Sequence, residues 1–322
     1  MKLAIVGAGP IGSVLGAYLS KGGNEVAFVD ILKDHLAAIK QSGLNISGFA
    51  EIKAPISATC ESIEDLKSFD PEIIFLCVKA SVTTWLIPNL QNLQSAMQTI
   101  HSGKYNLHLV CFQNGLDIED EVAGVFGKDN TLRVVINYAG NYIAPGQIKL
   151  SFFNKPNYIG GLSLKGNTLA KEIVQIMTKS GLDTTSVTDI KKYVWEKVIL
   201  NSALSALCAV TGMTMKQAMD FHPTYHLVES ILKEGINVAG AVGYDYGPDF
   251  FNHCIEYLRK AGHHKTSMHI DVENGRPTEI DYINKKIVDY GRTQMIDTPY
   301  NETITSLIKA IEKRIALSKI ST

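Results

Sequence analysis

Short, uninterrupted runs of apolar residues alternate with segments of helical spacing along the first half of the chain. A continuous apolar run is typical of a parallel strand covered on both faces. Between these runs, segments such as Ile11–Leu19 repeat apolar residues at helical intervals. The pattern predicts an α/β fold with a doubly wound parallel sheet. The predicted strands are Leu3–Val6, Glu25–Asp30, Ile73–Val78, His108–Phe112, Leu132–Asn137 and Lys149–Phe153.

The second half of the chain has a different pattern. Thr168–Lys179 has helical spacing, and Gly181–Val187 is interpreted as a short strand or a linker. From about Asp189 onward strand signals nearly vanish, and Tyr193–Val210 is apolar almost all round, which is typical of a buried helix. We therefore predict an α/β domain over residues 1–187 and a mostly helical domain over residues 188–322. The further predicted helices are Leu227–Val242, Asp249–Lys260, Thr278–Tyr290 and Tyr300–Leu317.

Composition narrows the class of protein. Of 322 residues, 45% are hydrophobic and 20% are charged, which argues against disorder. The formal net charge of −1 gives no electrostatic reason to expect nucleic acid or an anionic membrane as the main partner. Five scattered cysteines without a Cys-x-x-Cys pair indicate neither disulfides nor structural zinc, and they suit a reducing cytoplasm. Although Leu3–Leu19 is uncharged, four glycines and a proline interrupt it, so we interpret it neither as a signal peptide nor as a membrane span.

A glycine-rich turn follows the first predicted strand. Gly7 would allow a tight turn, Gly9 would let a pyrophosphate approach the backbone, and Gly12 would let the next helix pack closely on the strand. The helix N-terminus then offers free amides and a favourable dipole to the phosphates. The alternative is a purely structural turn. The whole motif reads Gly7-Ala8-Gly9-Pro10-Ile11-Gly12.

Asp30 ends the second predicted strand, 21 residues after Gly9, where an acid accepts hydrogen bonds from the adenosine ribose. The alternative is an aspartate that faces solvent. A carboxylate at this position repels a 2′-phosphate, whereas NADP sites usually offer an arginine. No arginine follows here, and Lys33 is a single, weakly placed cation. The residues therefore favour NAD(H) over NADP(H).

Lys197 lies in an apolar helical segment and shares one helix face with Asn201, four residues later. A buried lysine has a lowered pKa and can donate a proton to a carbonyl oxygen near neutral pH. The alternative is a lysine at the helix rim whose long side chain reaches solvent.

Three further polar residues are candidates for a site. Ser267 follows Thr266, and Glu279 lies in a segment that begins a helix at Pro277 or Thr278. The alternative for Glu279 is a carboxylate in the first helical turn that interacts with the helix dipole. Asn114 follows a predicted parallel strand, where loops border a ligand crevice, although Asn-Gly is also a simple turn.

The combination of these segments resembles the ketopantoate reductase (2-dehydropantoate 2-reductase) family over roughly residues 1–315. The glycine turn is common to dinucleotide-binding proteins, whereas the lysine helix and the segment from Ser267 to Ile283 are much more specific. The matching segments are GAGPIG at 7–12, Val78-Lys79-Ala80, Gln113-Asn114-Gly115, Trp195-Glu196-Lys197 with Asn201, and Ser267-Met268 followed by Glu279 in PTEIDYI.

The resemblance implies a Rossmann domain joined to a helical domain, with the active site in the cleft between them. It implies NADPH-dependent reduction of a 2-oxo acid, in the pathway to pantothenate and coenzyme A, without a metal. Lys197 would protonate the ketone oxygen, and Glu279 would hold the substrate and the lysine in register and contact the cofactor. Asn114, Asn201 and Ser267 would line the substrate, with Asn114 also near the cofactor, and Lys79 would lie beside the cofactor.

Two residues depart from the family pattern. Where the family has a second asparagine four residues after the first, this chain has Ser205, so the substrate's polar end is expected to be held differently. Where the family commonly has a basic residue for the 2′-phosphate, this chain has Asp30. Both departures fit a changed preference for substrate or cofactor.

Several alternatives stay open at this point. An opine-type or related hydroxyacid dehydrogenase would keep the fold and change the substrate, and a nicotinamide-binding sensor would lack turnover. A homodimer is possible. His222 and His226 are four residues apart, but Pro223 lies between them and no carboxylate partner is evident, so we interpret them as surface histidines and predict no metal.

Overall fold

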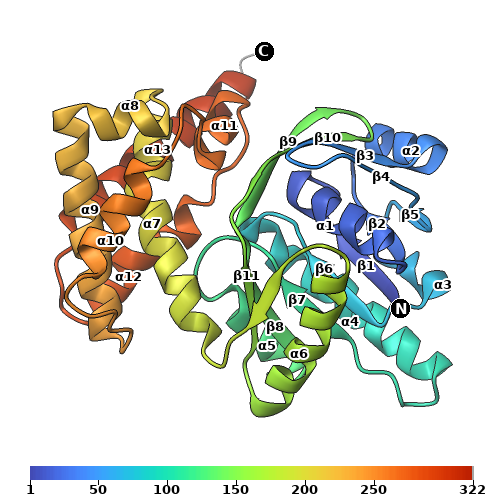
Figure 1. The fold of residues 1–322 in the computed structure, drawn as a ribbon. Coiled ribbons are helices and arrows are strands. Elements are labelled where there is room, and N and C mark those ends of the chain that lie inside the picture. The colour runs from blue at the N-terminus through green and yellow to red at the C-terminus, as the bar shows by residue number, and fades with distance from the viewer. Residues whose placement is uncertain (321–322) are drawn as a thin grey trace. The chain divides into compact units, whose positions relative to one another are not determined.

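The computed structural model describes residues 1–320, which fold into two compact units (Figure 1). The first unit contains residues Met1–Gln113 and Asp117–Ile190. The second unit begins at Lys191 and also contains the short segment Asn114–Leu116. The chain therefore contributes three residues to the second unit long before the helices of that unit begin.

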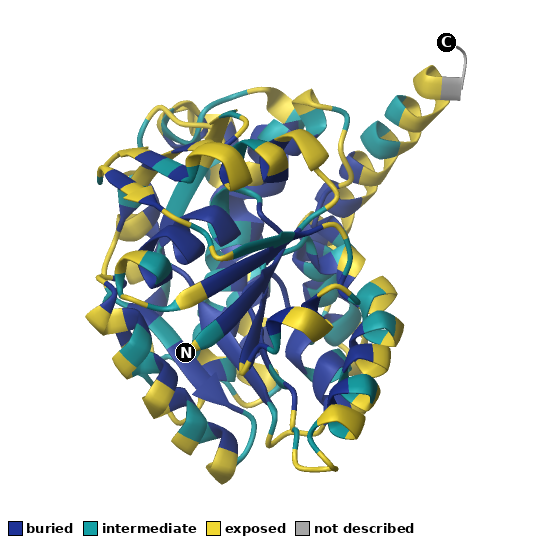
Figure 2. Cartoon of the chain, turned by 90° about the vertical axis from the view of Figure 1, so that its right-hand side faces the viewer, coloured by how far each residue is buried: buried dark blue, intermediate teal, exposed yellow. Residues whose placement is uncertain are grey.

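The first unit is built on an eight-stranded sheet with the order β12-β11-β8-β7-β6-β1-β2-β5. Its paired strands are parallel except β11, which runs antiparallel to β8. The strands are largely buried (Figure 2). This confirms the predicted α/β class. The strands are β1 (Lys2–Val6), β2 (Glu25–Val29), β5 (Ala58–Cys60), β6 (Ile73–Leu76), β7 (His108–Cys111), β8 (Thr131–Val135), β11 (Asn157–Gly161) and β12 (Thr184–Ser186).

Helices cover both faces of this sheet, and β1 shows why the four residues Leu3–Val6 are all apolar. Leu3 and Ile5 point into a core shared with α1 and α6, whereas Ala4 and Val6 point into a second core shared with α4 and α5. Successive side chains of a strand point to opposite faces, so a strand in a sheet covered on both sides favours apolar residues at consecutive positions. The helices are α1 (Pro10–Lys21), α2 (Lys33–Ser42), α3 (Leu66–Phe69), α4 (Ala80–Ile100), α5 (Ile118–Phe126) and α6 (Leu164–Lys179).

A second sheet, with the order β4-β3-β10-β9, packs on α1. Its strands are β3 (Leu44–Gly48), β4 (Ile52–Ala54), β9 (Tyr138–Ala144) and β10 (Gln147–Phe153). The predicted strand Lys149–Phe153 thus belongs to this mixed sheet, and the prediction that placed it with the parallel strands is wrong. Its first five residues alternate between exposed and buried, because only one face of the sheet is covered. Helix α1 is buried between two sheets, which explains the uncharged run Leu3–Leu19.

The second unit is helical, as predicted. Its helices are α7 (Ile190–Thr211), α8 (Met215–Asp220), α9 (His222–Ala241), α10 (Phe250–Arg259), α11 (Ser267–Glu273), α12 (Asn284–Thr293) and α13 (Pro299–Ile320), with a 3-10 helix η1 (Ile280–Tyr282). The prediction of one continuous helix over Thr278–Tyr290 is wrong, because Ile283 (φ −110°, ψ −94°) separates η1 from α12. The short helices α8 and α11 were not predicted.

Helix α7 is the core helix of the second unit. Within the described residues it is the one helix long and apolar enough to cross a membrane, but 72% of that apolar window is buried inside the protein. Its hydrophobic character is therefore explained by core packing. All five cysteines are free thiols.

Candidate functional site

The glycine turn of the first unit has the local geometry that its three glycines require. Gly7 has φ +103°, and a Cβ there would lie 2.8 Å from the backbone of Cys77. A Cβ on Gly12 would lie 1.9 Å from the carbonyl oxygen of Gly7, so α1 packs directly against the turn. A Cβ on Gly9 would meet nothing within 4 Å. The backbone of Gly9 thus borders open space, which a pyrophosphate could occupy.

The turn leads directly into α1. Gly9 is the N-cap, Pro10 occupies the first helical turn, and no side chain caps the helix N-terminus. Amides at an uncapped N-terminus, together with the helix dipole, favour an anionic group. The residues Gly7–Gly12 therefore fit a dinucleotide phosphate.

Asp30 lies just after β2 and is held by backbone amides. Its Oδ2 accepts a hydrogen bond from the amide of Ala8 at 2.5 Å, and its Oδ1 accepts one from the amide of Leu32 at 2.9 Å. Each carboxylate oxygen has a further lone pair that could accept a ribose hydroxyl. Asp30 is thus fixed against the glycine turn and is not simply a solvent-facing residue.

The surroundings of Asp30 offer little positive charge. The ammonium of Lys33 forms a 2.6 Å ion pair with Glu61, and Ile31 is 86% exposed. Lys79 is the N-cap of α4, two residues after Cys77, whose backbone touches the glycine turn. The predicted cofactor residues Gly7–Gly12, Asp30 and Lys79 therefore all lie in the first unit, at the carboxyl ends of β1, β2 and β6.

Lys197 lies in α7, between the buried residues Trp195 and Val198. Desolvation by burial lowers the pKa of Lys197 from 10.5 to about 8, although part of the residue reaches solvent. The ammonium form is less favourable in this environment than in water, so it gives up its proton more readily. Asn201 lies one turn further along the helix and is also partly exposed.

Asn114 and Glu279 are 165 residues apart in sequence, but the second unit brings them together. The amide nitrogen of Asn114 lies 3.5 Å from a carboxylate oxygen of Glu279. The segment is anchored next to this contact, because the amide of Leu116 donates to the carbonyl of Tyr282 at 3.0 Å. Gly115, at φ +113°, is needed there, since a Cβ would lie 2.5 Å from Tyr282.

Glu279 is buried, with 5% of its surface exposed, and it precedes η1 as the N-cap residue. The alternative that placed it in the first turn of a helix is wrong, and its side chain forms no capping hydrogen bond. Its neighbour Thr278 is fixed by Glu312 of α13, which accepts hydrogen bonds at 2.8 Å from both the amide and the hydroxyl of Thr278. No sequence pattern indicated the role of Glu312, because that role depends on a tertiary contact.

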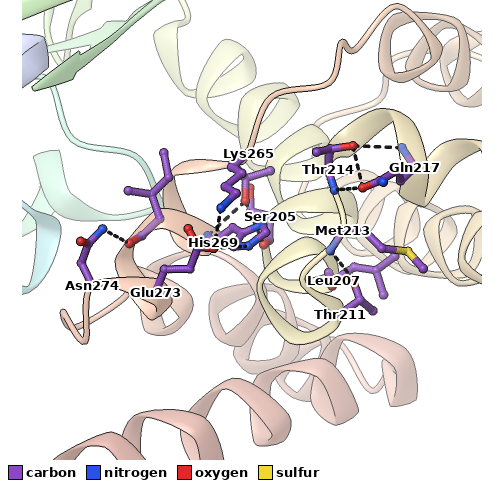
Figure 3. Close-up of polar contacts among 12 residues, drawn as sticks. Ser205, Leu207, Thr211, Met213, Thr214, Gln217, Lys265, His269, Glu273 and Asn274 are labelled. Carbon is purple, nitrogen blue, oxygen red and sulfur yellow. Dashed lines mark hydrogen bonds and ion pairs between the residues drawn. The ribbon is translucent and has the colours of Figure 1, made fainter. Parts of the chain in front are cut away.

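Ser205 and the segment of Ser267 also meet in the second unit (Figure 3). The hydroxyl of Thr266 donates to the carbonyl oxygen of Ser205 at 3.2 Å and accepts from the amide of His269, so it caps α11. Ser205 is buried, and Ser267 is exposed. His269 was not predicted as a site residue; it is buried, and its Nε2 lies 3.4 Å from a carboxylate oxygen of Glu273.

The remaining histidine pair lies on the surface at the start of α9. The Nε2 atoms of His222 and His226 are 3.1 Å apart, and Nδ1 of His226 lies 3.3 Å from a carboxylate oxygen of Glu229. The expectation that the pair has no carboxylate partner is therefore wrong. Across residues 1–320, no group of three or more histidine, cysteine or acidic side chains is arranged to hold a metal ion.

Comparison with known proteins gives a consistent result over both units. The 2-dehydropantoate 2-reductases of Streptococcus pyogenes and Pyrococcus abyssi are 27% and 28% identical over 316 residues, which is 97% of this chain and 98% of each relative. A solved D-mandelate dehydrogenase with NADH and anilino(oxo)acetate is 26% identical, with a TM-score of 0.83 over 98% of this chain and 99% of that one. The 2-dehydropantoate 2-reductase of Geobacter metallireducens shares the fold, with 24% identity and a TM-score of 0.86 over 96% of this chain and 99% of that one.

Family models match the two halves of the chain in order. The model of ketopantoate reductase PanE/ApbA matches residues 3–163, and the model of its C-terminal region matches residues 189–312. These matches confirm the resemblance inferred from the motifs, and the chain belongs to the ketopantoate reductase family.

Proposed function

We propose that this protein is an NADH-dependent reductase of a 2-oxo acid, with Lys197 as the general acid. Membership of the family supports the broader activity, NAD(P)H-dependent reduction of a 2-oxo acid to a 2-hydroxy acid. The observation that carries the proposal is the environment of Lys197. Its pKa of about 8 is that of a lysine adapted to proton transfer.

The chemistry requires a proton donor beside the ketone oxygen. When bound, the dihydronicotinamide supplies a hydride to the ketone carbon. The ammonium of Lys197 stabilises the negative charge that develops on the oxygen and then donates a proton, so that the C=O group becomes C–OH. With a pKa of about 8, roughly 90% of Lys197 is protonated at pH 7, and the proton leaves more easily than from an ordinary lysine.

The other predicted residues of the second unit would orient the substrate. Glu279 is buried and contacts Asn114, so the two polar groups form a preassembled pair. We assign to this pair the positioning of the substrate and of Lys197, and to Asn201, Ser205 and Ser267 polar contacts with the substrate. Preassembly matters because a displacement of about 1 Å costs on the order of 100-fold in rate.

The preference for NADH rests on the charges around Asp30. The carboxylate of Asp30 would repel a 2′-phosphate. Lys33, the cation that follows Asp30 in the sequence, already forms an ion pair with Glu61. The similar D-mandelate dehydrogenase was solved with NADH. We expect the protein to bind NADH more tightly than NADPH. Substitution of Asp30 by alanine should reduce this difference in affinity.

Two classes of 2-oxo acid are candidates. Ketopantoate is favoured by the similarity to the 2-dehydropantoate 2-reductases. An aryl-substituted 2-oxo acid is favoured by Ser205, because a hydroxyl replaces the larger amide and leaves more room and fewer polar contacts. The solved D-mandelate dehydrogenase with anilino(oxo)acetate supports this second candidate.

The test is a panel of ketopantoate, 3-methyl-2-oxobutanoate and phenylglyoxylate, each with NADH and NADPH, followed by cofactor absorbance. A mixture of an amine and a 2-oxo acid tests the opine-type alternative.

Lys197→Ala should lower turnover by about 100-fold or more, with unchanged NADH affinity, whereas Lys192→Ala on the exposed part of the same helix should have little effect on turnover. Absence of cofactor oxidation with every 2-oxo acid would overturn the proposal.

A cytoplasmic location and a homodimer stay predictions. Light scattering would measure the oligomeric state.

A further inference from the structure

His35 is a buried histidine in the first unit with 1% of its surface exposed, and the proposed chemistry does not use it. It lies in α2 and has hydrogen-bond partners from two other parts of the fold. Its Nδ1 lies 2.9 Å from the amide nitrogen of Gly146, in the turn between β9 and β10. Its Nε2 lies 3.3 Å from the hydroxyl oxygen of Ser13, in the first turns of α1.

These contacts fix which nitrogen of His35 carries the proton. The amide of Gly146 can only donate, so Nδ1 must be the acceptor. The hydroxyl of Ser13 already donates its proton to the carbonyl oxygen of Ala8 at 2.7 Å. Nε2 must therefore carry a proton and donate it to Ser13. Only the neutral imidazole with its proton on Nε2 satisfies every contact, because a second proton on Nδ1 would face the amide of Gly146.

The chain of hydrogen bonds ends at the peptide group between Ala8 and Gly9. In a trans peptide the C=O and N–H bonds point in opposite directions. Because Ser13 holds the carbonyl of Ala8 on the inner side, the N–H of Gly9 is turned to the opposite side. The backbone of Gly9 borders open space, because a Cβ there would meet nothing within 4 Å, so a phosphate would have room to reach this amide. The orientation of one phosphate-binding amide is thus set by Ser13, and that of Ser13 by His35.

We propose that neutral His35 is a positioning residue for the dinucleotide turn, which orients the Gly9 amide through Ser13 and couples phosphate binding to the β9–β10 turn. The inference rests on the proposed function in one respect, namely that a nicotinamide dinucleotide binds at Gly7–Gly12. It concerns His35 alone, and not the reaction in the second unit.

The environment of His35 makes the arrangement sensitive to pH. Desolvation by burial lowers the pKa of His35 below its ordinary value of 6.5, and the charge of Asp30 and the backbone of Ala8 act in the opposite direction. The ring of Tyr142, from β9, packs on the imidazole with 5.3 Å between ring centroids. Because the folded pKa is lowered, the network is complete above about pH 6.5 and is lost as pH falls through the folded value.

Two conservative substitutions separate the two hydrogen bonds of His35. His35→Gln places an amide near the position of Nε2 and retains a donor for Ser13, whereas His35→Asn places one near Nδ1 and retains only the acceptor for Gly146. Ser13→Ala removes the link to Ala8 directly. His222→Gln, on the surface of the second unit, is the matched control.

The probe is ADP-ribose, titrated by calorimetry into the full-length protein, because it has the pyrophosphate but no nicotinamide. At pH 8, His35→Gln should bind within about threefold of the unmodified protein, whereas His35→Asn and Ser13→Ala should bind about tenfold more weakly. Thermal unfolding of each variant monitors folding. A merely structural role would make both histidine variants bind equally, because both remove the imidazole ring.

The pH profile is the second readout. Binding to the unmodified protein should weaken by at most about tenfold between pH 8 and pH 5.5, as expected for a group of pKa no higher than about 6.5. Binding to His35→Gln should stay constant over the same range. Equal affinity of the Asn and Gln variants would overturn this inference alone. So would a loss of ADP-ribose affinity between pH 8 and pH 5.5 that is the same in His35→Gln as in the unmodified protein. If ADP-ribose does not bind the unmodified protein at any pH, the inference and the proposed cofactor site both fail.

Discussion

Replacing Lys197 by methionine should make the protein inactive and more stable at the same time. Methionine has nearly the same length as lysine but no charge, so it fits the apolar surroundings of α7 without desolvating an ammonium group. The protein retains lysine at the expense of folding free energy, and we attribute this to its use in proton transfer.

The size of the effect follows from the pKa. A decrease from 10.5 to about 8 corresponds to about 3 kcal/mol against the ammonium form at pH 7, at about 1.4 kcal/mol per pH unit. Part of Lys197 reaches solvent, which weakens the penalty, so we expect Lys197→Met to gain about 2 kcal/mol in unfolding free energy. The penalty is complete below about pH 8, where both the folded and unfolded states carry the proton.

Between pH 8 and 10.5 the unfolded state binds more protons at this position than the folded state, so the stability of the unmodified protein rises with pH. The advantage of Lys197→Met should therefore shrink as pH increases. The assay is urea unfolding at pH 7 and pH 10, with Lys192→Met as the control for loss of a surface lysine. A variant no more stable than the unmodified protein at pH 7, or an advantage of equal size at both pH values, would refute the reasoning.

Three other predictions follow from described contacts. The rate of reduction should fall about tenfold per pH unit above about pH 8, as Lys197 loses its proton; a flat profile from pH 7 to 10 would contradict its role as the acid. Gly9→Ala should unfold at the same temperature but bind NADH more weakly, whereas Gly12→Ala should lose about 3 kcal/mol of stability, because its Cβ would overlap the carbonyl of Gly7. Asn284→Leu should lose about 2 kcal/mol, measured by urea unfolding, since it removes the buried amide that donates to the carbonyl of Ser202 and to the side-chain oxygen of Asn301; unchanged stability would contradict this reasoning.

The sequence predicted those parts of the fold that depend on neighbouring residues. The glycine turn is one example, because Gly7, Gly9 and Gly12 act within a single strand–turn–helix unit. The second sheet was not predicted, since β3 pairs with β10 through residues such as Ile46 and Ile148, which are far apart in the chain. Hydrophobic periodicity identifies a strand but not its partner.

The candidate site shows the same division. The helical spacing of Lys197 and Asn201 followed from the sequence alone. The grouping of Asn114 with Glu279 came from the family resemblance, because no local pattern joins residues so distant. The supporting contacts of Glu312 and His35 had no sequence signal, since they depend on where other helices and turns place a carboxylate or an amide.

The assignment of Asn114–Leu116 to the second unit has a consequence for protein engineering. A chimera that exchanges only the C-terminal half with a relative would pair a foreign η1 with the native Asn114 loop. The hydrogen bond from Leu116 to Tyr282 and the close packing of Gly115 would then have to form across a mismatched seam. Grafting substrate selectivity from one relative to another therefore calls for two transplanted pieces, the helical half and this three-residue loop.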